Sequence, residues 1–143
     1  MNGSDAGPAP AAGLVVVDAA NVVGSVPDGW WRDRRGAAER LRDRLAALAL
    51  DGLAQGAGGP AWATRPPLDI VLVVEGAARG VEPVAGVRVD TAPGSGDDRI
   101  VEVVAEREPG RRCLVVTADR GLRARVRELG AEVVGPRAVR PGR

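Results

Sequence analysis

Continuous apolar runs, rather than alternating ones, mark the first strong elements along the chain. Residues 14–17, 70–74 and 114–116 are short stretches of valine, leucine and isoleucine. Runs of this kind are typical of strands that are buried on both faces, as in a parallel sheet. Shorter candidates for strands lie at 87–89 and 132–134. The pattern therefore predicts a mostly parallel sheet of about five strands.

Between these runs the apolar positions follow the helical period. Leucines repeat at i, i+4 and i+7 within residues 32–50, which predicts an amphipathic helix. Similar spacing predicts helices over about 96–108 and about 122–129, the last of them closed by Gly130. Because strands and helices alternate, we expect an α/β fold. It is a three-layer sandwich in which helices cover both faces of a Rossmann-like sheet.

The length of 143 residues fits one globular domain. We expect this domain over 13–135, after a disordered leader over 1–12 and before a basic tail over 136–143. Residues 51–67 are rich in glycine and proline and are predicted to form a mobile surface loop. The start resembles no signal peptide, and no apolar run reaches about 18 residues. We therefore expect a cytoplasmic protein that does not contact membranes.

The composition excludes whole classes of mechanism. The chain has no His, Lys, Phe or Tyr, so all 20 basic residues are Arg, and its one cysteine is Cys113, a small core residue by its place in an apolar run. Without imidazole there is no Ser-His-Asp or Cys-His catalysis, and without lysine there is no P-loop or Schiff base. The usual zinc sites need His and several Cys. Any chemistry must rest on carboxylates, Arg, Ser or Thr, and a bound metal.

Acidic residues follow the predicted strands at their carboxyl ends. Asp18, Glu75 and Asp119 each come at, or shortly after, the end of an apolar run. Asp97 and Asp98 open one of the predicted helices. Because the carboxyl ends of parallel strands share one edge of the sheet, and ligands bind at that edge, we expect these carboxylates to face one another across a small cleft.

A cluster of this kind repels itself unless a cation neutralises it. Hard oxygen ligands suit Mg²⁺ or Mn²⁺, which bind through few carboxylates together with the phosphate oxygens of a substrate. A metal-bound water would then be the nucleophile for hydrolysis of a phosphodiester. The alternative is that these acids are ordinary helix caps, because Ser95 to Asp98 fits a capping box and Asp119 could cap the next helix.

Four short motifs occur in a fixed order along the chain. They are V-D-A-A-N-V-V-G at 17–24, V-V-E-G at 73–76, G-S-G-D-D-R-I at 94–100 and V-V-T-A-D-R at 115–120. In order and spacing they resemble the motifs of NYN domains, the YacP-like branch of the PIN-like ribonucleases. The resemblance implies a PIN-like fold, with the first and fourth strands adjacent at the centre of the sheet. It also implies metal-dependent endonucleolytic cleavage of RNA.

The resemblance implies roles for individual residues as well. It places metal ligands and catalytic carboxylates at the strand ends and the helix start: Asp18, Asp97, Asp98 and Asp119. Glu75 would be a further ligand, at a position where this family often has Asp. Asn21 would hold a metal-bound water or a phosphate, and Thr117 would orient a ligand water. Within the same motifs, we also expect Ser95 and Arg120 to contact the substrate.

Arginine is unevenly distributed along the chain. Residues 111–143 carry a local charge of +6, whereas residues 61–110 carry −4. An acidic, metal-binding centre beside an arginine-rich flank suits a nucleic-acid strand. Arg79 is a candidate for a phosphate contact, because a guanidinium forks onto phosphate oxygens. The alternative for the arginines of the last predicted helix is a solvated face: they are Arg123, Arg125 and Arg127.

Trp30 and Trp31 are adjacent at the start of the first long predicted helix. An exposed tryptophan could stack on an unpaired base. Adjacent residues of a helix point about 100° apart, so one of the two could pack while the other stays exposed. In a chain without Phe or Tyr, filling of the core is the interpretation that we favour over base stacking.

The leading hypothesis is a metal-dependent endoribonuclease. Two alternatives stay open. One is a hydrolase of small phosphorylated nucleotides at the same site, of the pyrophosphohydrolase or phosphatase type. The other is a non-catalytic PIN-like module that binds RNA or a protein. No pattern selects RNA over DNA, or a monomer over a homodimer or a complex with a protein partner.

Overall fold

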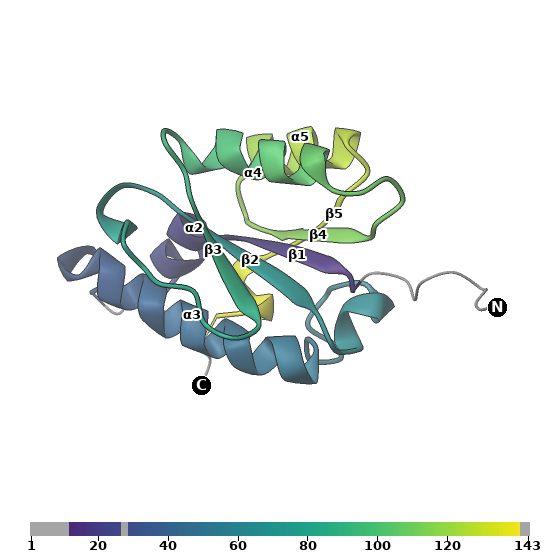
Figure 1. Ribbon diagram of the computed structural model, residues 1–143, viewed down its shortest axis with the longest axis horizontal. Helices are drawn as coiled ribbons and strands as arrows, with labels where there is room; N and C mark the ends of the chain where they lie inside the picture. Colours follow the sequence, from purple (N-terminus) through teal and green to yellow (C-terminus); the bar gives the residue numbers. More distant parts are fainter. Residues whose placement is uncertain (1–11, 27–28, 141–143) are drawn as a thin grey trace.

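A computed structural model describes residues 12–26 and 29–140 and confirms the predicted three-layer α/β fold (Figure 1). The sheet has five strands: β1 (Leu14–Asp18), β2 (Asp69–Val74), β3 (Val87–Thr91), β4 (Cys113–Val116) and β5 (Glu132–Val134). Their order is β3-β2-β1-β4-β5, and every neighbouring pair is parallel. The first strand is therefore central and adjacent to the fourth, as the motifs imply.

In the part of the chain that the structure describes, four α-helices cover the sheet: α2 (Ala19–Gly24), α3 (Arg34–Asp51), α4 (Gly96–Glu106) and α5 (Arg120–Glu128). The three helices that the sequence predicts are present with ends shifted by a few residues. Short 3₁₀ turns add η1 (Trp30–Arg32), η2 (Ala61–Thr64), η3 (Gly76–Ala78) and η4 (Pro136–Ala138). The helix α2 was not predicted, because six residues are too short to show a helical period.

The two faces of the sheet bury separate hydrophobic clusters. Helices α4 and α5 lie over one face, while α2, α3 and η4 lie over the other (Figure 1). Successive side chains of a strand point to opposite faces. Val15 and Val17 accordingly pack with the leucines of α3, whereas Val16 packs with Ile100 of α4. This double burial explains why the strands read as continuous apolar runs.

The packed domain extends beyond Gly135. Val139 is fully buried in the cluster under α3, and Arg140 donates a hydrogen bond from Nη1 to the carbonyl of Ser25 at 3.2 Å. Residues 136–140 are therefore part of the domain rather than a free tail. The other three residues of the predicted tail, and all but Ala12 of the predicted leader, lie outside the described residues.

The glycine- and proline-rich segment between α3 and β2 is partly packed. Leu53 and Ala63 are buried, and the amide of Leu53 donates to the carbonyl of Ala63 at 2.8 Å. The mobility expected for 51–67 stays a prediction. Within the described ranges, no helix combines the length and the apolar character that crossing a membrane requires.

Candidate active site

The carboxyl end of the central strand places Asp18 in a buried position, with only 4% of its surface exposed. Its Oδ2 accepts a hydrogen bond from the Thr117 hydroxyl at 3.0 Å, and its Oδ1 accepts one from the Asn21 amide at 3.3 Å. Asp18 is thus also the N-cap of α2. Burial raises the pKa of the Asp18 carboxyl to about 6, against the effect of these two hydrogen bonds.

Two polar side chains tie the ends of β1 and β4 together. The Thr117 hydroxyl, itself fully buried, donates to Asp18 and accepts a hydrogen bond from the Asp119 amide at 3.1 Å. The Asn21 side-chain oxygen accepts from the Ala118 amide at 2.8 Å. Both residues therefore position the strand ends through protein contacts. The contacts to water or phosphate that the motifs imply for them stay predictions.

The loop after β2 and the start of α4 bring two further acids to the same edge of the sheet. One oxygen of Glu75 accepts a hydrogen bond from the Gly96 amide at 2.9 Å, which holds the two segments together. Burial raises the pKa of Asp97, and the nearby charges of Asp119 and Glu75 raise it further. Asp97 and Glu75 also contribute to the raised pKa of Asp18. We call Asp18, Glu75, Asp97 and Asp119 the acid cluster.

The capping interpretation is also confirmed for two residues of the edge. The Ser95 hydroxyl accepts from the Asp98 amide at 3.1 Å, and Asp119 Oδ1 accepts from the Leu122 amide at 2.9 Å. A cap uses one carboxylate oxygen, so capping by Asp119 leaves its other oxygen available to a ligand. Asp98 differs from the acid cluster, because its exposed carboxylate pairs with Arg125 at 3.1 Å.

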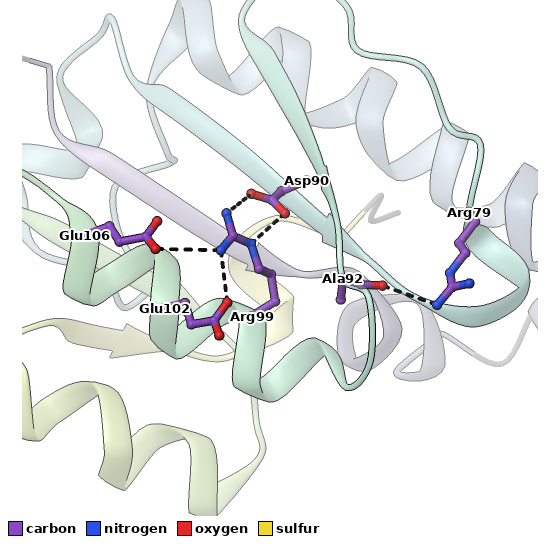
Figure 2. A network of polar contacts seen from close by, with 6 residues as sticks. All are labelled: Arg79, Asp90, Ala92, Arg99, Glu102 and Glu106. Carbon is purple, nitrogen blue, oxygen red and sulfur yellow. Dashed lines mark hydrogen bonds and ion pairs between the residues drawn. The ribbon is translucent and has the colours of Figure 1, made fainter.

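A network of ion pairs fixes the first turn of α4 against β3 (Figure 2). Arg99 binds both oxygens of Asp90, at 2.8 and 2.9 Å, and also pairs with Glu102 at 3.0 Å. This anchor lies two residues after Asp97 and so helps to set the position of that carboxylate. The sequence carries no signal for it, since strand β3 and helix α4 meet only in the folded chain.

Arg79 is exposed and lies along the loop that leads to α4 (Figure 2). Its Nη2 donates to the carbonyls of Ala92 at 3.4 Å and Pro93 at 3.2 Å. These long hydrogen bonds leave most of the guanidinium donors available for a phosphate. Arg120, the first residue of α5, is exposed as well.

The arginines of α5 are only in part a solvated face. Arg123 donates from Nε to the carbonyl of Thr117 at 2.8 Å, and Arg125 pairs with Asp98. Both therefore contact residues next to the acid cluster, whereas Arg127 is exposed.

Cys113 lies at the amino end of β4, at the edge of the sheet opposite the acid cluster. It is buried, and burial raises the pKa of its thiol to about 11, which agrees with a core residue.

The preference for Trp30 and Trp31 as core residues is wrong. Trp31 is 55% exposed, Trp30 is half-buried, and neither belongs to the two hydrophobic clusters. Both lie in η1, before α3 begins, where no buried helical face is available to them.

The fit of the site to a metal ion rests on its donor chemistry. Burial and nearby acids raise the pKa of Asp18 and Asp97, and a divalent cation bound by their hard carboxylate oxygens would relieve this cost. In the described part of the chain, however, no group of three or more Asp, Glu or Cys side chains converges closely enough to hold a metal. The carboxylates that we expect to face one another across a small cleft therefore do not form a ready-made metal site in these residues. The carboxylates would have to close around an ion.

The fold and this arrangement define a three-layer α/β protein with acidic side chains at the carboxyl edge of its parallel sheet. Among solved structures, the chain is similar to Rae1 (YacP) from Bacillus subtilis, with a TM-score of 0.65 and 18% identity over 87% of this chain and 70% of that one. The W164L mutant of the same protein gives a TM-score of 0.64 and 16% identity, over 89% and 72% of the two chains. The resemblance that the motifs indicate is thus confirmed at the level of the fold.

Neither a scan against models of protein families nor a comparison with curated proteins finds a match.

Proposed function

We propose that this protein is a metal-dependent endoribonuclease that hydrolyses RNA phosphodiester bonds at the acid cluster. The observation that carries the proposal is the burial of Asp18 at the end of the central strand, beside acids that raise its pKa. A buried carboxylate whose nearest charges are also negative is costly for the fold. Strongly perturbed groups of this kind are typical of functional sites.

In this proposal Asp18, Asp97 and Asp119 are the principal ligands for Mg²⁺ or Mn²⁺, with Glu75 as a further one. The bound ion would supply a nucleophilic water and neutralise charge on the phosphodiester. The Thr117 hydroxyl and the backbone amide of Asn21 hold the Asp18 carboxylate in place. Asp98, because it pairs with Arg125, contributes less to ligation than Asp97.

RNA is supported as the substrate by the resemblance of the four motifs to those of the YacP-like ribonucleases and by the fold shared with YacP. The arginines near the acid cluster suit a polyanion: they are Arg79, Arg120, Arg123 and Arg125. Arg123 and Arg125 contact protein groups beside the cluster, so a phosphate that these two arginines bind would lie near the carboxylates.

The test is cleavage of an end-labelled single-stranded RNA by the pure protein in Mg²⁺ or Mn²⁺, with EDTA as the metal-free control. We expect cutting that EDTA abolishes and that Asp18→Asn removes. Asp43→Asn is the matched control, because it makes the same change on the exposed face of α3. Circular dichroism and thermal melting of both variants would verify that they fold.

The alternatives predict other results in the same assay. No cutting of RNA, together with metal-dependent release of phosphate from nucleoside triphosphates, would contradict the proposal and favour a small-nucleotide hydrolase. RNA binding with no cutting in either metal would favour a non-catalytic module. Equal cutting by the wild type and Asp18→Asn would show that the acid cluster is only a set of caps.

A further inference from the structure

A pocket of about 210 Å³ opens beside the acid cluster, between α2, α3 and the turn η3. Its lining includes Trp30, Arg34 and Glu75 and four small side chains: Ala19, Ala20, Ala38 and Ala78. Ala19 and Ala20 directly follow Asp18, and Glu75 belongs to the acid cluster. The pocket and the proposed catalytic site are therefore continuous.

The indole of Trp30 is held in place before any ligand binds. The Arg34 guanidinium lies 5.3 Å from the centre of its ring, and the Trp31 ring meets it edge-on at 6.1 Å and 87°. The end of α2 lies close to the indole as well, because a Cβ at Gly24 would be in van der Waals contact with the ring atom Cζ2 at 3.7 Å. A ligand that stacks on an aromatic ring fixed in this way loses little side-chain entropy on binding.

Charge around the pocket matches a nucleotide rather than a purely apolar ligand. Glu75, at the pocket wall, can accept hydrogen bonds from the N–H groups of a base. Exposed arginines belong to the pocket or follow its lining residues in the chain: Arg34 lines it, Arg35 comes next, and Arg79 follows Ala78. Arg35 reaches the loop that follows Arg79, because its Nη1 lies 3.5 Å from where a Cβ of Gly80 would be. These guanidinium groups suit the phosphates on either side of a base.

We propose that this pocket binds one unpaired nucleobase of the RNA strand, next to the phosphodiester that the acid cluster cleaves. The inference rests on the proposed function and adds a substrate class to it. A base that enters a pocket against Trp30 has to leave its stack and its pair, so the site selects single-stranded over double-stranded RNA.

Binding is measured separately from cleavage, by fluorescence anisotropy of a labelled single-stranded RNA in EDTA. Trp30→Ala is expected to weaken binding about 5- to 150-fold, the range that loss of one base–aromatic stack gives. Trp31→Ala is the comparison variant, since Trp31 lies outside the pocket lining and the change removes only its edge-on contact with Trp30, so it should weaken binding clearly less than Trp30→Ala does. Trp30→Phe keeps an aromatic face and should retain most of the affinity.

A second variant tests the space itself and leaves Trp30 intact. Ala20 is exposed within α2, so Ala20→Leu is compatible with the helix and places a larger side chain at the pocket wall. We expect it to weaken binding of the single strand as Trp30→Ala does. An RNA duplex of the same sequence should bind all these variants equally.

An abasic site identifies the base that occupies the pocket. Moving one abasic nucleotide along the RNA should reveal a position at which wild-type affinity falls, and at that position Trp30→Ala should cause no further loss, because both changes remove the same contact. Unchanged affinity in both Trp30→Ala and Ala20→Leu, or equal losses with and without the base, would overturn the pocket proposal.

The two proposals fail in different ways. If metal-dependent cleavage depends on Asp18 but binding does not depend on Trp30 or Ala20, the endoribonuclease proposal stands and the base pocket is wrong. If binding depends on Trp30 and on the base while no metal supports cleavage, the pocket is confirmed as a base-binding site and the nuclease proposal is wrong.

Discussion

Asp18 and Asp69 occupy opposite ends of the same pair of neighbouring strands and have opposite environments. Asp69 begins β2 and accepts hydrogen bonds from Arg88 at 2.9 and 3.2 Å and from Arg111 at 2.7 Å. Although burial acts against them, these arginines lower the pKa of Asp69. Asp18 ends β1 among other acids, and its pKa is raised to about 6. One aspartate is stabilised as an anion by the fold, and the other is not.

The difference between Asp18 and Asp69 indicates that the amino edge of the sheet serves stability and the carboxyl edge serves binding. At the amino edge, Arg111 also donates to the carbonyl of Ala12, so the pairing of Asp69 fastens the start of β1 and the loop before β4. At the carboxyl edge, the hydrogen bonds hold acids near one another without neutralising them. An arrangement that costs stability and keeps carboxylates together is expected where a cation and a substrate bind.

The largest effect should separate two adjacent residues of the carboxyl edge. Burial and, next to it, the charges of its acidic neighbours raise the pKa of Asp97, whereas Asp98 pairs with Arg125 in solvent. We expect Asp97→Asn to lower metal-dependent RNA cleavage by more than about 100-fold, the upper end of what loss of an outer-shell partner costs a metal site. Asp98→Asn should lower it far less. Equal losses in kcat/KM for the two variants would show that the acid cluster is wrongly bounded.

The next effect concerns the pH dependence of stability without metal. Below about pH 4, Asp18 is protonated in the folded and the unfolded chain. Between about pH 4 and 6 only the folded chain keeps the proton, so wild-type stability falls as the pH rises, by up to about 3 kcal/mol. Asp18→Asn lacks this titration and should be the more stable protein at pH 7 in EDTA. Urea unfolding at pH 4, 5.5 and 7 measures the difference.

The pH dependence expected for the stability difference between the wild type and Asp18→Asn can be contradicted by one outcome. If the free energies of unfolding of the wild type and Asp18→Asn differ by the same amount at pH 4 and pH 7, burial does not perturb Asp18 and the comparison between the two edges fails. Added Mg²⁺ should stabilise the wild type at pH 7 but not the variant, because ligand binding to the folded state raises its stability.

Asp69→Asn should have a smaller effect of opposite kind. It removes charge-assisted hydrogen bonds to two arginines, so the free energy of unfolding at pH 7 should fall by about 1–3 kcal/mol. Because the pKa of Asp69 is lowered in the fold, its contribution is present at neutral pH and is lost as the pH falls below about 4. RNA cleavage at 25 °C should be unchanged. A loss of activity without a loss of stability would contradict this assignment.

The architecture could be predicted from the sequence because strands buried on both faces leave continuous apolar runs, and because the carboxyl ends of parallel strands must share an edge. Asp18, Glu75 and Asp119 could be placed together on that ground alone. The hydrogen bonds and ion pairs around these carboxylates could not be predicted from the sequence. That Thr117 rather than an arginine meets Asp18, and that Asp98 turns to Arg125, depends on contacts between residues about 30 to 100 positions apart in the chain.

Other features were missed because packing overrides local pattern. Val139 reads as part of a basic tail, yet it fills the cluster beneath α3. Trp30 reads as a core residue by its apolar character, yet the turn η1 holds it at the surface beside a pocket. The fixed position of Asp97 depends on the Arg99–Asp90 pair, whose partners belong to different elements.

The smallest expected effect is that of Arg79→Ala, which tests whether Arg79 binds a phosphate of the RNA or supports the loop before α4. Its guanidinium can bind a phosphate, but it also donates to the carbonyls of Ala92 and Pro93 in the loop before Asp97. As a phosphate contact, Arg79→Ala should weaken RNA binding about fivefold for every sequence and reduce the salt dependence of binding by about one charge.

As a support for the loop, the same variant would lower kcat and leave binding and its salt dependence unchanged. We expect the first result, because both carbonyl contacts are long and the side chain is exposed, so little of its bonding capacity is used by the loop. Arg88→Ala, at the amino edge and away from the acid cluster, is the control for loss of one positive charge. If Arg88→Ala changed the salt dependence of binding as much as Arg79→Ala does, binding would depend on the net charge of the protein and not on a specific RNA contact at the carboxyl edge.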